Sequence, residues 1–367
     1  MDAAVRSLVV VVAVAALPFV GGCSSSSEQC AGKPYPAIAA QWVKPPADPR
    51  AAAPTGSGVT VFAMRKLLLA DTNMQMVATA DAWKEYGLNI DGNDTTCGGT
   101  VPACRNAVRL PQQGEDAPGG VDNAFGQLDI PELQGIVATP TATASANVEN
   151  YGGTTNLLVV TGLDGATSAS GLSASLLVAG PLGRKPKWDG SDVWPVDSSS
   201  VQGNAATAPQ LSFSSSYVSD GVFVAAPPSG DGEIALGAFG VPLVIPIRHV
   251  QVVMKLSQDG AVAQGIVSGV VPLAALLSTA QEFLAAQGGK YESFCGDAAF
   301  ASIAQYIAGS ADILLDGTQD STKDCDGVSF GMGFEADRVQ LGSVVAVTPL
   351  PSCSDAGAGG ARDAGGG

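Results

Sequence analysis

Short runs of β-branched and aliphatic residues, separated by turn residues, make up most of the chain between residues 59 and 347. We expect strands at 59–69, 156–161, 172–179, 211–218, 222–226, 234–239, 243–247, 249–256, 261–270, 328–334 and 339–347. Asp-Gly pairs, which are strong hairpin signals, lie between several of these runs. Short strands with closely spaced turns are typical of an antiparallel β-sandwich or barrel. The pattern therefore predicts a mainly β domain of one of these two kinds.

Two helices are predicted to interrupt the strands, in a small insert near residues 272–309. Pro272 suits the first position of a helix, and apolar residues then recur at helical spacing until the glycine pair at 288–289. A second apolar stripe at helical spacing begins after Asp297, a suitable N-cap, and stops at Gly309. Both stripes are expected to face the core.

The composition favours a folded domain and excludes a basic nucleic-acid-binding surface. Hydrophobic residues make up 46% of the 367 residues and charged residues only 14%, whereas disordered chains are poor in apolar and rich in charged residues. The formal net charge of −16 repels the phosphates of nucleic acids and anionic lipid surfaces. We therefore expect no nucleic-acid partner, and any membrane contact must come from something other than charge.

The first two dozen residues have the pattern of an export signal that ends at a cysteine. Arg6 precedes an apolar run over 8–20, and Gly21 and Gly22 stand directly before Cys23. The run is too short to span the hydrocarbon core of a membrane, which takes about 20 residues. The A-x-A-like cleavage site of an ordinary secretory signal is absent. The segment resembles a bacterial lipoprotein signal peptide with its lipobox.

The resemblance implies a lipid anchor. In that family the signal peptidase cuts between Gly22 and Cys23, and Cys23 carries a diacylglycerol on its sulfur and a further acyl chain, such as palmitate, on its amine. Two or more acyl chains anchor a protein stably in a bilayer, whereas one is marginal. Ser24 is not the aspartate that the family uses for inner-membrane retention. The resemblance thus implies an exported protein on the outer membrane, facing the periplasm or the exterior, rather than on the inner membrane.

Four segments follow from these patterns. Residues 1–22 form the signal peptide, and residues 23–58 form a lipidated tether rich in serine, proline and alanine. Proline keeps such a segment semi-extended, so it separates the domain from the bilayer. Residues 59–353 form the mainly β globular domain. Residues 354–367 are a Gly/Ala-rich tail without apolar periodicity, which we expect to be disordered.

Six cysteines remain besides Cys23, and an even number in an exported protein indicates disulfides. Closeness along the chain favours the pairs Cys97–Cys104 and Cys295–Cys325. Cys30 and Cys353 would then pair near the two ends of the mature chain. The C-x-x-C spacing of zinc sites is absent, and the chain has a single histidine.

A serine hydrolase is one alternative. Residues 327–331 match the G-x-S-x-G pattern of α/β-hydrolases around Ser329. That motif requires a strand-to-helix turn and a later histidine, but the strand pattern continues past Ser329 and His249 comes earlier. The order His249, Asp312, Ser329 is that of chymotrypsin-like enzymes, but the residues around Ser329 do not resemble that family.

A glycoside hydrolase would use two carboxylates about 5–9.5 Å apart. Glu233 and Glu335 lie on or beside predicted strands and are the candidates for such a pair. Trp188 and Trp194, in a polar loop, are candidates for an exposed platform that stacks on sugar rings. Solvated carboxylates and partly buried aromatics are the alternatives.

Two loops rich in acidic and amide side chains predict a structural calcium site. Ca²⁺ takes six to eight hard oxygen ligands, and Asp91, Asn93, Asp94, Asp116 and Asp122 supply such oxygens. The sequence departs from an EF-hand loop, which needs a glycine at position 94 and a closing glutamate. Asp and Asn also favour turns for conformational reasons alone, which is the competing explanation. No other cofactor is expected.

The patterns together favour a lipid-anchored cell-envelope protein with a non-catalytic binding or structural domain. The bilayer is the expected partner through acylated Cys23, with a glycan or an envelope protein as a further partner. Two alternatives remain open. One is an exported hydrolase that acts on a glycan or an ester, and the other is a scaffold subunit of an envelope complex.

Overall fold

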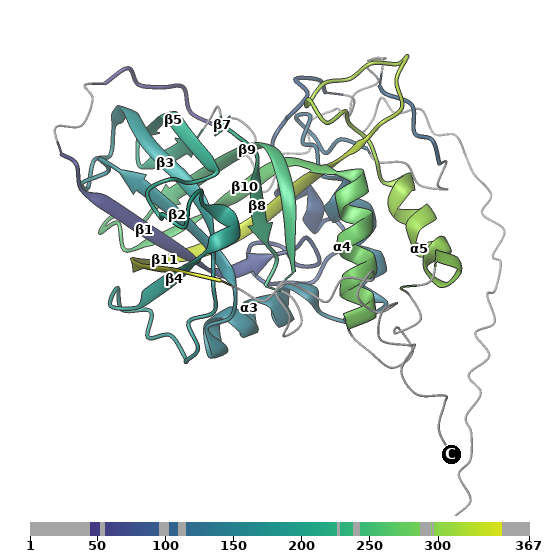
Figure 1. The fold of residues 1–367 in the computed structure, drawn as a ribbon. Helices are drawn as coiled ribbons and strands as arrows, with labels where there is room; N and C mark the ends of the chain where they lie inside the picture. The colour runs from purple at the N-terminus through teal and green to yellow at the C-terminus, as the bar shows by residue number, and fades with distance from the viewer. Residues whose placement is uncertain are drawn as a thin grey trace, which may run out of the picture.

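The computed structural model describes residues 45–51, 56–94, 103–108, 115–225, 228–237, 243–286, 295 and 297–346. Strands predominate in this part of the chain, which confirms the predicted mainly β class. The strands curve into a barrel, and the helices lie along one side of it and at one end (Figure 1).

Eight antiparallel strands form the barrel. They are β1 (Val59–Leu68), β2 (Thr155–Thr161), β3 (Ala169–Ala179), β5 (Leu211–Ser219), β6 (Val222–Ala225), β9 (Val244–Leu256), β10 (Val262–Pro272) and β11 (Gly327–Val345). Each pairs with the next in this order, and β11 pairs with β1 to close the ring. Closure removes the free edges that make open sheets prone to aggregation. Of the two expected architectures, the structure has the barrel.

Three short strands add to this wall. They are β4 (Val193–Asp197), β7 (Pro228–Ser229) and β8 (Gly232–Ala235). β4 runs parallel to the end of β11, β7 pairs with β5, and β8 pairs with the beginning of β9. The Asn156 carboxamide on β2 donates to the Ala235 carbonyl and accepts from the Ala235 N–H, both at 2.8 Å. β8 is therefore held from two sides, by β9 and by β2.

Apolar side chains from all eight barrel strands form one continuous core. Phe62, Phe213, Phe223 and Phe334 are among its largest fully buried members. An eight-stranded barrel has an interior that side chains of this size can fill. The core thus explains why the strand runs are rich in aliphatic and aromatic residues.

A second apolar layer covers part of the barrel's outer face. Val224, Val253 and Ile266 cluster with Tyr86, whereas their neighbours along the strands, such as Val252, belong to the barrel core. Successive residues of a strand point to opposite faces, so these three side chains point outward. The covering segment includes η1 (Ala82–Glu85), a short 3-10 helix. These strands are therefore buried on both faces.

Tyr86 is the centre of this outer layer. Its side chain is fully buried, and its Oη donates a hydrogen bond to the Thr72 carbonyl at 2.7 Å. Gly331 and Gly333 on β11 lie directly against it, and a Cβ at either position would collide with Tyr86. The alternating glycines in this strand therefore make room for the aromatic ring and its backbone.

One carboxamide joins the outer layer to the barrel. Asn123 is 1% exposed, and its Nδ2 donates to the carbonyls of Trp83 (3.1 Å) and Tyr86 (2.9 Å). Its Oδ1 accepts from the N–H groups of Gly126 (3.0 Å) and Gly331 (2.9 Å). All four hydrogen-bonding positions of the side chain are thus used, and they reach three separate segments.

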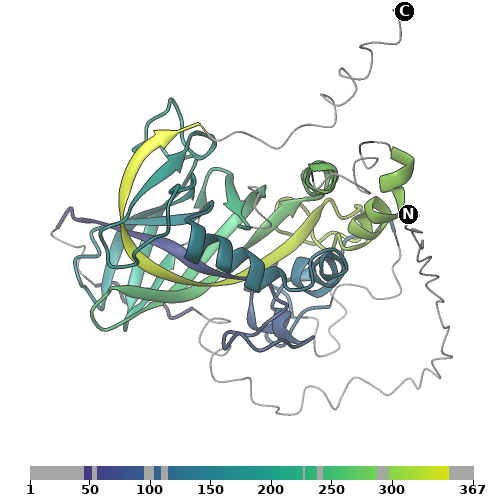
Figure 2. The ribbon, with the colours of Figure 1, turned by 90° about the horizontal axis from the view of Figure 1, so that it is seen from below.

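The helices occupy the outside of the barrel (Figure 2). They are α3 (Pro140–Tyr151), which packs along β1, α4 (Leu273–Ala286), which packs against β9 and β10, and α5 (Asp297–Gly309), which lies beside α4. A π-helical segment, η2 (Phe125–Asp129), continues into α2 (Ile130–Gln134). α4 and α5 confirm the two-helix insert expected near 272–309. The sequence pattern does not predict α3, η2 or α2.

α3 escapes sequence analysis because its contact with the barrel is partly polar. Ser145 and Thr141 are buried, and their hydroxyl oxygens accept hydrogen bonds from the N–H groups of Leu67 (3.1 Å) and Leu69 (2.8 Å). The buried face thus combines these hydroxyls, which satisfy backbone donors at the end of β1, with the small apolar side chains of Ala144 and Val148. A helix of this kind lacks the periodicity on which a prediction would rest.

The disulfide pairing differs from the expected one. Cys104 is bonded to Cys325, with the two Cα atoms 5.2 Å apart and a sequence separation of 221. Cys295 is also disulfide-bonded, but not to Cys325. The expected pairs Cys97–Cys104 and Cys295–Cys325 are therefore wrong. Cys23, Cys30, Cys97 and Cys353 lie outside the described residues.

The backbone explains why Cys104 meets Cys325. The Arg105 N–H donates to the Lys323 carbonyl at 2.8 Å, and the Cys325 N–H donates to the Arg105 carbonyl at 2.9 Å. These bonds bring the segment around residue 104 alongside the segment that leads into β11. Closeness in the fold, and not closeness along the chain, decides the pairing.

We predict that Asn123→Ala lowers the free energy of unfolding by about 3–5 kcal/mol, because it removes four buried hydrogen bonds to backbone groups. Urea denaturation followed by tryptophan fluorescence measures the change. Gln202→Ala removes an exposed carboxamide and serves as the matched control, with an expected effect below about 0.5 kcal/mol. Equal losses in the two variants would contradict the role given to Asn123.

Candidate functional site

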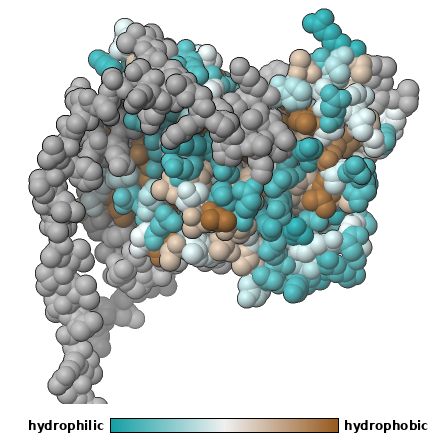
Figure 3. Space-filling model, turned by 180° about the vertical axis from the view of Figure 1, so that it is seen from behind, coloured by the Kyte–Doolittle hydropathy of each residue, from teal (hydrophilic) through white to brown (hydrophobic). Residues whose placement is uncertain are grey.

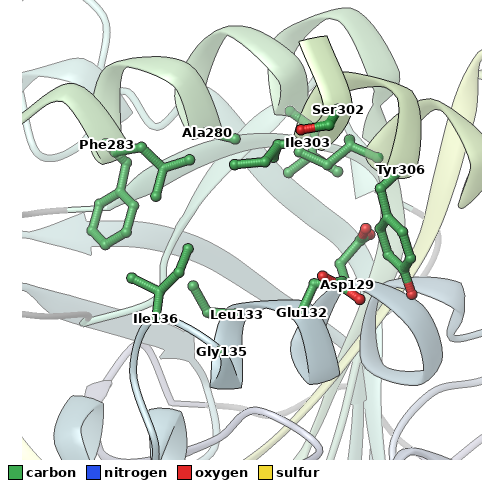
Figure 4. Close-up of a pocket in the computed structure, with 13 residues that line it drawn as sticks. Asp129, Glu132, Leu133, Gly135, Ile136, Ala280, Phe283, Ser302, Ile303 and Tyr306 are labelled. Carbon is green, nitrogen blue, oxygen red and sulfur yellow. The ribbon is translucent and has the colours of Figure 1, made fainter. Parts of the chain in front are cut away.

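A pocket of about 430 Å³ lies between α2, α4 and α5, outside the barrel core (Figure 4). α2 forms one wall, and α4 and α5 form the opposite wall. Pockets of about 300–1,000 Å³ with mostly apolar walls are the usual binding sites for small organic molecules. The pocket is therefore the candidate functional site.

The walls of the pocket are apolar. They include Leu133, Ile136, Leu276, Ala280, Phe283 and Ile303. Phe283 and Leu276 are buried, whereas Leu133, Ile136 and Ile303 keep part of their surface exposed. The exposed part of these side chains is the surface that a bound apolar molecule would cover.

Polar groups gather at one end of the pocket, where Asp129, Glu132 and Tyr306 lie next to one another (Figure 4). Asp129 is 9% exposed, and its Oδ2 accepts a hydrogen bond from the Ser310 hydroxyl at 3.0 Å. Its Oδ1 is buried without a hydrogen-bond partner among the described residues. Tyr306 Oη donates to the Leu128 carbonyl at 3.1 Å, which leaves its oxygen lone pairs as acceptors.

The position of Asp129 depends on the π-helical segment. η2 begins after Asn123, whose Oδ1 binds the Gly126 N–H, and Asp129 is its last residue. A π-helix is wider than an α-helix, is rare, and occurs frequently at functional sites. Phe125, at the start of η2, packs on Phe330 of β11 with ring centroids 5.2 Å apart. The barrel and Asn123 together fix the segment that presents Asp129.

Three buried carboxyl groups near this end of the barrel have raised pKa values. Desolvation is the main cause for each, and it raises the pKa of Asp122 to about 9 and that of Asp312 to about 7. Desolvation also holds the pKa of Asp129 well above its usual value, against the Ser310 hydrogen bond, and the charges of Asp312 and Glu132 add to the rise. Burial thus keeps the protonated form of each group favoured to a higher pH than for an exposed carboxyl.

The structure does not assemble a serine triad. Ser329 is fully buried within β11, where its hydroxyl donates to Asp312 Oδ2 (2.6 Å) and accepts from the Ala124 N–H (2.8 Å). His249 is an exposed residue with a φ of +49°, at an irregularity in the β9–β10 pairing, and it lies against Gly317. Ser329 and Asp312 are thus brought together, but without the histidine.

The two glutamates considered for glycoside hydrolysis have separate partners. Glu335 on β11 binds Arg65 at 3.2 Å and Lys66 at 2.8 Å. Glu233 on β8 accepts a hydrogen bond from the Ser199 hydroxyl at 2.5 Å. Each carboxylate is engaged in a local structural contact. Neither residue lines the pocket between the helices.

The expected aromatic platform is also absent from the described structure. Trp194 is fully buried, and its ring packs on Trp188 with centroids 5.8 Å apart. The backbone N–H groups of Lys187 and Trp188 donate hydrogen bonds to the buried Asp192 carboxylate. The loop that carries Trp188 is therefore folded inward around Asp192, and Trp194 lies on β4.

The residues of the predicted calcium site have a structural role in the loops. Asp122 Oδ2 accepts hydrogen bonds from the N–H groups of Ile90 (2.6 Å) and Asp91 (3.3 Å), and Asp91 Oδ1 accepts from the Asn93 N–H (2.8 Å). Asp91 and Asp116 lie close enough to Asp122 to raise its pKa. Among the residues described, three or more such side chains are not grouped in a way that would hold a metal ion. Calcium binding by Asp91, Asn93, Asp94, Asp116 and Asp122 stays a prediction.

The sequence analysis missed this pocket. It assigned the stripes of α4 and α5 to the core, and Leu276, Phe283 and Ile307 do belong to the core. Five lining residues, between Asp129 and Ile136, come from a segment that was not predicted as a helix. One signal was present: Ile130, Leu133 and Ile136 recur at a spacing of three directly after Asp129. This spacing is typical of one face of a helix. The segment is short, however, so the pattern alone is weak.

Comparisons with protein-family models, with curated protein sequences and with solved structures find no match to this chain. The site must therefore be judged on its own geometry. In the part of the chain that the structure describes, helices are too short or too polar to cross a membrane.

We predict that the free energy of unfolding falls by several kcal/mol as the pH rises from 5 to 9, at about 1.4 kcal/mol per pH unit for each carboxyl that is still protonated only in the folded state. Each buried carboxyl has a folded-state pKa above its unfolded value, so its contribution is complete below about pH 4 and is lost as the pH rises toward the folded-state pKa. For Asp312 this window ends near pH 7, and for Asp122 near pH 9. Urea denaturation at each pH, with EDTA present, measures the slope.

Two isosteric variants separate these windows. Asp312→Asn should make the fall of the free energy of unfolding with pH less steep only below pH 7. Asp122→Asn should make it less steep up to pH 9. A wild-type stability that is flat or rises between pH 5 and 9 would show that these carboxyls are ionised in the folded protein.

Proposed function

We propose that this protein is a non-catalytic binding module of the cell envelope, anchored by lipid at Cys23, that takes up a small apolar molecule between α2, α4 and α5. The observation that carries the proposal is the pocket itself, because partly exposed apolar side chains from two walls face a common space of about 430 Å³. Removing apolar surface from water contributes roughly 25 cal/mol per Å². A ligand that covers these walls would gain this free energy.

The anchor places this module at a membrane. The proposal for Cys23 rests on the apolar run and the small residues before the cysteine, and it extends to the outer membrane through Ser24. The acidic body, at net charge −16, has no electrostatic attraction to anionic lipid. The acyl chains are then the contact with the bilayer, and the tether at 23–58 sets its distance from the domain.

A hydrolase is less well supported than a binding module. Ser329 is fully buried and is hydrogen-bonded to a carboxyl group, and His249 contacts Gly317. Glu233 and Glu335 are each engaged by other side chains. A nucleophile or a general acid must reach a substrate, and these contacts do not favour that. A glycan ligand is likewise disfavoured, because the pocket walls are apolar.

A scaffold role receives less support from the surface. Large docking faces are usually contiguous apolar patches of several hundred Å². Among the described residues on the face of Figure 3, apolar side chains are scattered in small groups between hydrophilic ones. The large hydrophobic residues that are most exposed, such as Val59, Tyr151 and Val193, belong to different elements. The pocket is the more specific feature.

We predict that Ala280→Phe weakens the binding of an apolar fluorescent probe, N-phenyl-1-naphthylamine, at least tenfold. Ala280 lies on α4 and faces the pocket, so a phenyl ring there occupies the space that the probe would fill (Figure 4). Fluorescence titration of the full chain measures the dissociation constant. The Cys23→Ser background avoids the need for detergent.

Ala274→Phe is the matched control, because it adds the same ring to an exposed position of the same helix outside the pocket. We expect its affinity for the probe to stay within twofold of the parent. Failure of the parent protein to bind the probe, or equal binding by both variants, would argue against the pocket as a ligand site.

The anchor is tested separately. We predict that Cys23→Ser moves the protein from the membrane fraction to the soluble fraction of the cells, because no acyl chains can then be attached. Mass spectrometry of the parent's amino-terminal peptide should show the added lipid. If the parent is already soluble and its amino terminus carries no lipid mass, the anchoring proposal is wrong.

A further inference from the structure

The polar end of the pocket is rich in hydrogen-bond acceptors. Asp129, Glu132 and Tyr306 lie together there, and the Tyr306 hydroxyl hydrogen is already used on the Leu128 carbonyl. Burial raises the pKa of Asp129, and a cation beside its carboxyl would lower that pKa and favour the ionised form, which only accepts hydrogen bonds. A cationic donor therefore fits this end.

The same end lacks a described counter-charge. The ion pairs among the described residues involve neither Asp129 nor Glu132. The charges that act most strongly on Asp129 are those of other carboxylates, Asp312 and Glu132. Asp129 is nine-tenths buried, and its Oδ1 has no hydrogen-bond partner among the described residues. A buried carboxyl oxygen normally has a hydrogen-bond partner, and a donor on a bound ligand would supply one.

We infer that the pocket accepts a small amphipathic amine, with its ammonium group at Asp129 and Glu132 and its apolar part between α4 and α2. This inference rests on the proposed function and names the ligand class. An ammonium group has three donors, which match Asp129 Oδ1, the Glu132 carboxylate and the Tyr306 oxygen. Its charge supplies the missing counter-ion.

The distribution of exposure supports the same orientation. Glu132 is exposed at the rim of the pocket, whereas Asp129 is buried beneath it. A cation would first meet Glu132 and then Asp129. The apolar lining at Phe283 and Ile136 lies away from this end in the view of Figure 4. The pocket is thus polar at one end and apolar at the other, as an amphipathic ligand requires.

Three ligands with the same eight-carbon chain test the inference: octylamine, octanol and octanoate. Isothermal titration calorimetry on the full chain with Cys23→Ser gives their dissociation constants at one pH and salt concentration. We expect octylamine to bind at least tenfold tighter than octanol, and octanoate to bind most weakly. Equal affinities for octylamine and octanol, or the tightest binding for octanoate, would overturn the inference.

Substitutions locate the effect. Glu132→Gln and Asp129→Asn should each lower the ratio of octylamine to octanol affinity about tenfold. Glu282→Gln removes a carboxylate from α4 outside the pocket lining and should leave this ratio unchanged. Glu132 is exposed, so its variant tests the inference even if Asp129→Asn fails to fold. An unchanged ratio in Glu132→Gln would count against the ammonium position.

The outcomes also separate this inference from the function on which it rests. If all three ligands bind with similar affinity and Ala280→Phe abolishes this binding, the apolar binding site stands but its preference for an amine does not. If none of the three ligands binds, and Ala280→Phe leaves probe binding unchanged, then both the inference and the proposed function are wrong.

Discussion

The carboxamide of Asn123 is the contact on which the arrangement outside the barrel depends. It binds two carbonyls of the segment around Tyr86, the N–H of Gly126 at the start of η2, and the N–H of Gly331 on β11. A single rigid side chain thereby sets three segments relative to one another. Because η2 ends at Asp129, the geometry of the pocket follows from this side chain as well.

Buried carboxyl groups are the energetic cost of this arrangement. Asp122 and Asp312 both accept hydrogen bonds from backbone N–H groups, and these bonds offset part of the cost of burial. Asp129 has only the Ser310 hydroxyl on one oxygen. The three carboxyl groups thus differ. Asp122 and Asp312 receive hydrogen bonds from the backbone, whereas Asp129 has a partner on one oxygen only. This difference distinguishes structural carboxyls from one that faces a pocket.

The local patterns of the sequence predict the strands and the helices α4 and α5, because each has a period that reflects a buried face. They do not distinguish a barrel from a sandwich, since both bury alternate residues in the same way. The closing contact between β1 and β11 joins residues far apart in the chain. The pairing of Cys104 with Cys325 fails to be predicted for the same reason.

The pocket could not be predicted from the sequence for a related reason, because its residues are far apart in the chain. Asp129 and Tyr306 lie 177 positions apart, and only the fold brings them together. The sequence does not show which apolar residues of α4 and α5 pack in the core and which line the pocket. The serine pattern around Ser329 misleads in the opposite direction. Its last glycine, Gly331, makes room for Tyr86, and its first, Gly327, packs against Val270 and Ile313.

The pairing of β1 with β11 has a consequence for biogenesis. Residues 61–68 find their partners at 333–339, near the end of the domain, so the ring cannot close until almost the whole polypeptide has been made. Contacts between such distant segments form slowly, since a long loop must be ordered first. The β11-facing edge of β1 therefore stays without its final partner until residue 339 has been made.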